Sequence, residues 1–117
     1  MLRAFLVCLF LLVGASARAE PPFTNHVNSA NASGTITSGG TYQSVYPQTL
    51  SRAGCTIQNN GANTMYVYFG PIANATHGAS VQIPAGQGLN CNVGNTVLPD
   101  QVSIDGTTAD SFYGNQW

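Results

Sequence analysis

Two cysteines are the residues whose chemistry the sequence defines most clearly. Cys55 and Cys91 are the cysteines left once an N-terminal export signal is removed, and an exported chain with two cysteines normally pairs them. Both cysteines lie in segments where apolar and polar residues alternate, and each occupies an apolar, inward-facing position. We therefore expect a disulfide inside the core that stabilises the fold by about 4 kcal/mol. The alternative, a catalytic thiol, needs a positive neighbour to lower its pKa, and Arg52 is the only basic residue near either cysteine.

Four tyrosines form the candidate interaction surface. Tyr66 and Tyr68 alternate with apolar residues and are expected to point outward from one strand, with Tyr42 and Tyr46 joining them. Tyrosines on one face of a sheet can stack on sugar rings or anchor a protein interface. The alternative is that they are ordinary strand residues, or that the parity is reversed and they are buried.

The histidines and aspartates give weaker signals. His26 and His77 predict solvated loop residues, because two separated histidines do not make a zinc site without further ligands. Three aspartates are spaced by five and lie near turns, which favours turn formation over Ca²⁺ binding or acid–base catalysis: Asp100, Asp105 and Asp110. The sequence therefore predicts no metal, no cofactor and no enzymatic activity. The alternative of a small secreted hydrolase would need at least one of these acids.

Residues 1–19 have the features of a secretory signal peptide. Arg3 precedes an apolar run over residues 4–13, and Ala17-Arg-Ala19 matches the small-x-small cleavage pattern. Removing 19 of the 117 residues leaves 98, enough for one small domain. We expect export to the periplasm or the outside of the cell; an uncleaved N-terminal anchor is the alternative.

The charge of the mature chain restricts its partners. Arg52 would be its only basic residue against four acids, which gives a net charge of −3. Binding to nucleic acid or to anionic lipid requires clusters of lysine and arginine, so both are excluded for the mature domain. A low-charge surface of this kind favours a protein partner, with a glycan as the alternative, and leaves homo-oligomerisation open.

Alternation of apolar and polar residues at a period of two predicts strands, and no helical period interrupts it. We expect an all-β, antiparallel β-sandwich or jelly roll of seven or eight short strands over residues 35–117, preceded by an extended flexible arm over residues 20–34. The arm is either a linker or a segment that orders on a neighbouring subunit. The clearest hairpin is predicted to join residues 55–58 to residues 64–69 through Asn59–Asn63.

The same parity assigns a face to each strand residue. The residues expected to point inward are Cys55, Ile57, Met65, Val67, Phe69, Val81, Ile83, Leu89, Cys91, Val93, Val102 and Ile104. Those expected to point outward are Thr56, Gln58, Tyr66, Tyr68, Gln82, Asn90 and Asn92.

Several short motifs resemble a group of small β-sandwich proteins of phages and prophage-bearing bacteria. The motifs, within residues 34–106, are Gly39-Gly-Thr41, Arg52, Cys55-Thr-Ile-Gln-Asn-Asn60, Met65-Tyr-Val-Tyr-Phe-Gly70 and Pro84-Ala-Gly86 before Leu89. The resemblance implies a virion-associated accessory or decoration-type protein without enzymatic activity. A signal peptide is not part of that pattern, and the resemblance assigns no functional residue.

Overall fold

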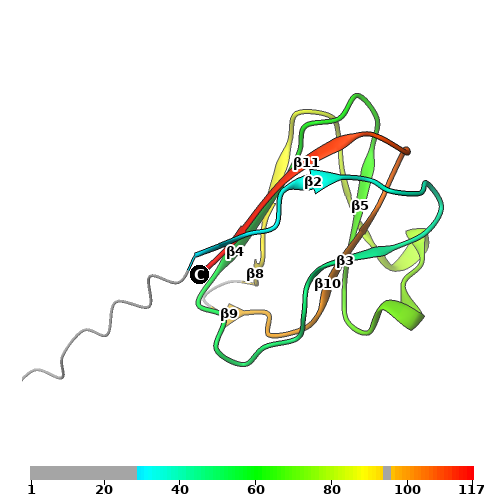
Figure 1. The fold of residues 1–117 in the computed structure, drawn as a ribbon. Coiled ribbons are helices and arrows are strands. Elements are labelled where there is room, and N and C mark those ends of the chain that lie inside the picture. Colours follow the sequence, from blue (N-terminus) through cyan, green and yellow to red (C-terminus); the bar gives the residue numbers. More distant parts are fainter. Residues whose placement is uncertain (1–28, 94–95) are drawn as a thin grey trace, which may run out of the picture.

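In the part of the chain that the structure describes, nine strands form two antiparallel sheets that lie face to face (Figure 1). The computed structural model describes residues 29–93 and 96–117. Sheet A contains β1 (Ala30–Asn31), β2 (Gly34–Thr35), β11 (Ser111–Gln116), β4 (Cys55–Asn59) and β7 (Gly88–Asn90). Sheet B contains β3 (Gln43–Tyr46), β10 (Val102–Asp105), β5 (Met65–Phe69) and β6 (Val81–Ile83). A separate ribbon pairs β8 (Asn92–Val93) with β9 (Thr96–Val97), and two 3₁₀ turns, η1 (Ile72–Asn74) and η2 (His77–Ala79), follow β5.

The order of the strands is that of a jelly roll. Both β1 and β2 pair with β11, so they act as one edge strand and each sheet has four positions. Only the connection from β5 to β6 stays within one sheet; every other connection between strands of the two sheets crosses from one to the other. Two sheets linked in this alternating way form the eight-stranded jelly-roll arrangement. The prediction of a small all-β sandwich is confirmed.

Strands β4 and β5 do not form the expected hairpin, because they belong to different sheets. β4 is flanked on both sides, by β11 and by β7, so no edge is left for β5. The side chain of Asn59 is buried and donates to the backbone oxygens of Asn63 at 2.7 Å and Ile83 at 2.8 Å, while its own oxygen accepts from Gly61 N at 2.9 Å. The Asn-Gly signal therefore marks a turn that crosses between sheets.

The core lies between the sheets and confirms most of the expected inward residues. Buried hydrophobic residues from both sheets form one cluster, comprising Ile36, Tyr46, Cys55, Ile57, Met65, Val67, Ile83, Cys91, Val102, Ile104 and Phe112. Phe69 and Leu89 are partly buried against it. Val81 is a wrong prediction: it lies on the edge strand β6 and 45% of it is exposed. The side chain of Val93 lies outside the described residues.

The ordered domain begins earlier than predicted. Residues 30–34 were expected to belong to the flexible arm, but β1 and β2 pair with β11 from Ala30 onward. The missed signal is weak, because these two-residue strands have little apolar alternation and exist through pairing with a distant strand. The predicted signal peptide and the arm over residues 20–28 lie outside the described residues. Within the described part of the chain, no helix is long and apolar enough to cross a membrane.

Candidate functional site

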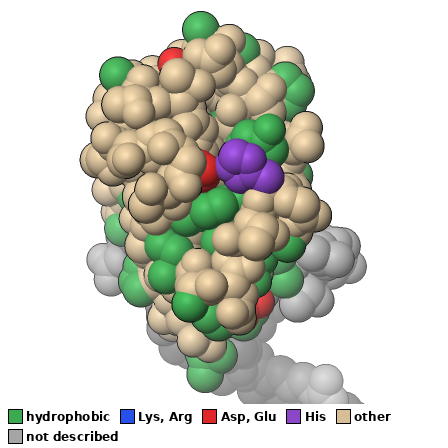
Figure 2. Space-filling model, turned by 90° about the vertical axis from the view of Figure 1, so that its right-hand side faces the viewer, with side chains coloured by type: hydrophobic (Ala, Val, Ile, Leu, Met, Phe, Trp, Pro, Cys, Tyr) green, Lys and Arg blue, Asp and Glu red, His purple; other side chains and the backbone are tan. Residues whose placement is uncertain are grey.

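The outer face of sheet B carries a cluster of ring side chains, which we call the aromatic cluster: Tyr42, Tyr66, Tyr68 and His77. The imidazole of His77 stacks on the Tyr66 ring, with 3.9 Å between centroids and planes 2° apart. Tyr42 meets His77 and Tyr68 edge-on, with centroids 6.0 and 6.4 Å away. In Figure 2 the purple histidine stands on this face with hydrophobic side chains gathered beside and below it. The prediction that Tyr66 and Tyr68 point outward is confirmed, although both are half-buried.

His77 is held by a buried carboxylate. Its Nε2 lies 2.7 Å from Oδ2 of Asp105, whose side chain is 1% exposed while that of His77 is 51% exposed. Oδ1 of Asp105 accepts from the backbone N–H groups of Gly40 at 2.9 Å and Gly106 at 2.7 Å. As predicted, His77 lies in the loop between β5 and β6 and its side chain is half exposed, but its contact with Asp105 anchors that loop to β10.

Asp105 was expected to lie in a turn, and only Val102 and Ile104 of this strand were expected to be buried. In the structure all four residues of β10 are buried, so both of its faces are covered. Val102 and Ile104 face the core as predicted, while Ser103 and Asp105 on the other face are also buried, and Asp105 lies against His77 of η2. Ser103 is opposite Ser44 on one side and Tyr68 on the other. Alternation in β10 gave no sign of this second covering layer, because a short polar residue and an aspartate are normally assigned to solvent.

A second contact fastens the same segment to sheet B. The hydroxyl of Tyr42 lies 2.6 Å from Oγ of Ser80, which in turn donates to the backbone oxygen of Thr76. Burial raises the pKa of Tyr42, and the hydrogen bond with Ser80 acts in the opposite direction. The aromatic cluster and these polar contacts together hold residues 71–80 against the sheet.

Tyr46 is not part of the interaction surface. It is buried, and its hydroxyl donates to the backbone oxygen of Thr56 at 3.2 Å. The reason is an irregularity in β3: Val102 is opposite Tyr46, but the next residue, Ser103, is opposite Ser44, so Val45 is an extra residue. Such a bulge reverses the parity of the strand, which a period of two cannot anticipate.

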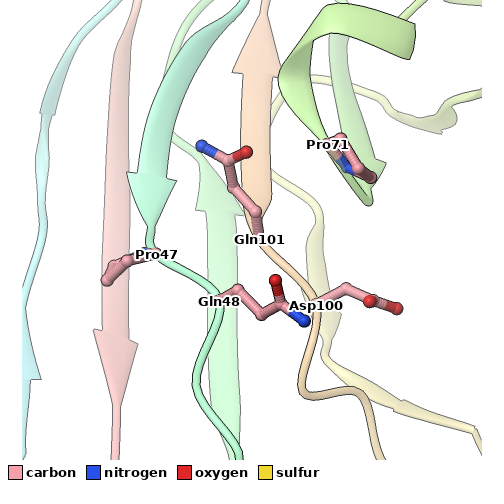
Figure 3. Close-up of a pocket in the computed structure, with 5 residues that line it drawn as sticks. All are labelled: Pro47, Gln48, Pro71, Asp100 and Gln101. Atoms are coloured by element: carbon pink, nitrogen blue, oxygen red, sulfur yellow. The ribbon is translucent and has the colours of Figure 1, made fainter.

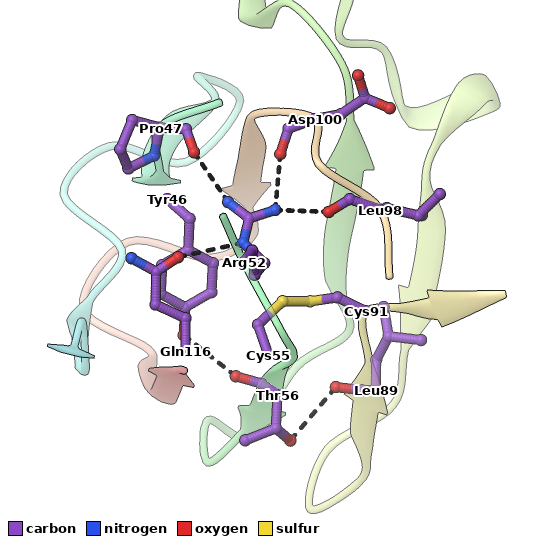
Figure 4. The surroundings of a disulfide bond; sticks show 10 residues. All are labelled: Tyr46, Pro47, Arg52, Cys55, Thr56, Leu89, Cys91, Leu98, Asp100 and Gln116. Atoms are coloured by element: carbon purple, nitrogen blue, oxygen red, sulfur yellow. Dashed lines mark hydrogen bonds between the residues drawn. A yellow bond between two sulfur atoms is a disulfide. The ribbon is translucent and has the colours of Figure 1, made fainter. Parts of the chain in front are cut away.

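Arg52 is a buried structural residue (Figure 4). Its guanidinium donates to the backbone oxygens of Pro47, Leu98 and Asp100, each at 2.8 Å, and to Gln116 Oε1 at 3.1 Å. It also lies 5.5 Å from the centre of the Tyr46 ring. These contacts tie the loop between β3 and β4 to the loop between β9 and β10 and to the end of β11. The sequence placed Arg52 in a loop but gave no indication that the loop closes around it.

The predicted disulfide between Cys55 and Cys91 is present, and both residues are buried (Figure 4). Their Cα atoms are 5.1 Å apart, and Cys91 N donates to Cys55 O at 2.9 Å. Cys91 directly follows β7, and β7 pairs with β4, which begins at Cys55. The disulfide therefore links two neighbouring strands of sheet A. It secures the edge of that sheet to its centre, which supports the structural interpretation over a catalytic thiol.

A hollow of about 320 Å³ lies where β3 ends and β10 begins, and Figure 3 shows its lining. The residues around it are Pro47, Gln48, Pro71, Asp100 and Gln101. The amide of Gln101 is already engaged, because it donates to Ser44 Oγ and accepts from Ile72 N, each at 3.1 Å. With one carboxylate and no nucleophile or histidine in this lining, the hollow offers no set of groups for acid–base or covalent chemistry.

The remaining candidates do not converge on a reactive centre. Asp110 accepts from the backbone and side-chain nitrogens of Asn63, each at 3.1 Å, so it braces a turn as predicted. Asp100 contributes its backbone oxygen to Arg52. Within residues 29–93 and 96–117, no group of three or more His, Cys, Asp or Glu residues could hold a metal ion. His26 lies outside the described residues.

No protein-family model matches this chain, and no match was found to a curated protein or to a solved structure.

Proposed function

We propose that this protein is an exported, non-enzymatic interaction module of the phage accessory or decoration type, and that it docks onto a protein assembly through the outer face of sheet B. The observation that carries the proposal is the aromatic cluster, whose four rings contact one another at the surface. Aromatic side chains that are already immobilised lose little conformational entropy on binding, which is why they act as anchors in protein interfaces.

The surroundings of the aromatic cluster suit a protein partner. Ile72, which is exposed, lies in η1 at one end of the same face and is fixed through its N–H to Gln101. Figure 2 shows no lysine or arginine on this face, and its carboxylate nearest the histidine is largely covered. A core that is apolar, aromatic and poor in charge is typical of protein interfaces.

The fold and the disulfide give weaker support. Jelly rolls occur in viral capsid proteins and in lectins, so the architecture is compatible with a virion role, but fold alone does not assign function. A buried disulfide persists in an oxidising compartment, which agrees with export. The motif resemblance to phage accessory proteins points in the same direction.

Sugar stacking on Tyr66 and Tyr68, the alternative function, has less support at this face. A sugar ring would need the open face of a tyrosine, and the imidazole of His77 already stacks on Tyr66. The two edge-on contacts of Tyr42 restrict access further. This geometry favours a protein partner over a glycan on sheet B.

The test is gradient fractionation of the native host culture after prophage induction, with the protein followed by intact mass. We expect the wild type to sediment with particles, and Ile72→Arg to remain in the soluble fraction, because a charge at the rim of the docking face would be desolvated without a partner. Leu50→Arg is the matched control, since Leu50 is exposed in the loop between β3 and β4. Soluble wild-type protein, or equal sedimentation of both variants, would contradict the proposal.

A further inference from the structure

The outer face of sheet A carries two aromatic residues in line on one strand. Tyr113 and Trp117 have the same parity on β11 and its extension, and they are 37% and 45% exposed. Trp117 is four positions after Tyr113, which in extended chain is a distance of about 13 Å. Asn115 lies between them on the same face. This spacing is longer than one pyranose ring, so the two rings could contact different units of one chain.

The indole of Trp117 packs on a glycine. The backbones of Trp117 and Gly54 pair through N–H···O distances of 2.9 and 3.0 Å. Side chains of directly paired residues share a face, and a Cβ atom on Gly54 would overlap the indole. The absence of a side chain at Gly54 therefore makes room for the indole beside β4.

Amide side chains surround the two rings in rows across the strands. Gln58 is directly opposite Tyr113, while Thr56 lies between Asn115 and Asn90. Among the described residues, the side chains of Gln58, Asn90 and Asn115 make no hydrogen bond. Each such amide offers both donors and an acceptor to a ligand. None of the residues on this face carries a charged side chain; they are Asn31, Thr35, Gly54, Thr56, Gln58, Gly88, Asn90, Ser111, Tyr113, Asn115 and Trp117.

We propose that this face binds a neutral oligosaccharide, with Tyr113 and Trp117 stacking on sugar rings and Gln58, Asn90 and Asn115 bonding to hydroxyls. Sugar hydroxyls both donate and accept, and therefore match amides that do the same. A charged ligand would be desolvated here without an opposite charge. A second protein surface would have to satisfy each amide individually while gaining little apolar contact beyond the two rings. The site is independent of the docking face on sheet B.

Trp117 is the only tryptophan of the chain, so its fluorescence reports on the site directly. The probes are cellohexaose, chitohexaose, mannohexaose, xylohexaose and laminarin, with polygalacturonate as the charged comparison. We expect at least one neutral probe to shift the emission with saturation, and Tyr113→Ala to weaken that binding about tenfold, the factor that 1.4 kcal/mol represents. Tyr113→Phe keeps the ring and should bind nearly as the wild type does.

Several results would overturn the inference. These are no saturable shift with any neutral probe up to millimolar concentration, tighter binding of polygalacturonate, or unchanged affinity in Tyr113→Ala. Sedimentation velocity addresses the other occupant: a wild-type dimer that Tyr113→Ala dissociates would identify the face as a contact between copies of this chain. Ile72→Arg should bind the sugar normally, so failure here and failure of the particle association remain distinguishable.

Discussion

The two outer faces of this sandwich differ in what lies over them. Part of sheet B is covered by residues 71–80, which contact Asp105, Tyr42 and Tyr66, and on this face Ser103 and Asp105 are as buried as the core. Sheet A has no comparable cover among the described residues, and its amides and rings stand open. The difference shows that polar strand residues on one sheet can be buried and support the fold, while those on the other sheet stay free to bind a ligand.

The faces also differ in how they are secured. On sheet A the Cys55–Cys91 disulfide links the edge strand β7 to its neighbour β4. On sheet B the covering segment is held by the pair of His77 and Asp105 and by the contact of Tyr42 with Ser80. The link on sheet A is covalent, whereas the contacts on sheet B are hydrogen bonds and ring stacking.

The largest expected effect is on the covalent side. Cys55→Ala/Cys91→Ala should lower the free energy of unfolding by about 4 kcal/mol, because it removes the closure of the loop between them. Urea unfolding of the oxidised wild type and of the double variant measures the difference. A loss below about 1 kcal/mol would mean that the sheet packing alone secures the edge of sheet A.

On sheet B, Asp105→Ala should cost about 3 kcal/mol, because it leaves the N–H groups of Gly40 and Gly106 without their acceptor and releases His77. Gln58→Ala on sheet A is the control and should change the stability by less than about 0.5 kcal/mol. Both are read from urea midpoints at the same pH. Similar losses in the two variants would abolish the distinction between the faces.

Between the faces, Tyr46 makes the core sensitive to alkali. Burial raises the pKa of Tyr46 while the charge of Arg52 acts the other way, so the neutral phenol is favoured in the folded state. The contribution of the neutral Tyr46 to the free energy of unfolding is complete below pH 10, the pKa of about 10 that tyrosine has in the unfolded chain. Above that pH the contribution is lost by about 1.4 kcal/mol per pH unit.

Comparing Tyr46→Phe with the wild type by urea unfolding at pH 9 and pH 11 isolates this contribution. The variant should lose about 1.4 kcal/mol less than the wild type over that interval. Parallel losses in the two proteins would show that Tyr46 ionises as easily in the folded state as in the unfolded chain.

The smallest effect on stability is expected at Tyr113. Because it is an exposed residue on an open face, Tyr113→Ala should change the free energy of unfolding by less than about 0.5 kcal/mol while it weakens sugar binding. Thermal unfolding beside the fluorescence titration separates the two. A loss of stability as large as that of Asp105→Ala would show that the open face has a structural role.

The sequence was informative where a residue's role depends on local alternation and on the redox compartment. It predicted the sandwich, the disulfide, most of the core and the outward direction of Tyr66 and Tyr68. It failed at Tyr46, where one extra residue in β3 reversed the parity. It also failed at the Asn59–Asn63 turn, because turn chemistry does not specify which strand the chain will pair with next.

The sequence by itself determined that this chain is a small, sparsely charged β domain with one disulfide, because period-two patterning, turn residues and cysteine number are properties of neighbouring residues. Only the tertiary structure decided which polar residues are buried and which are open. Asp105 meets His77 across 28 positions, and Gly54 meets Trp117 at the end of another strand. Such contacts depend on the jelly-roll connection of distant segments, and alternation along one strand carries no information about the layer that will cover it.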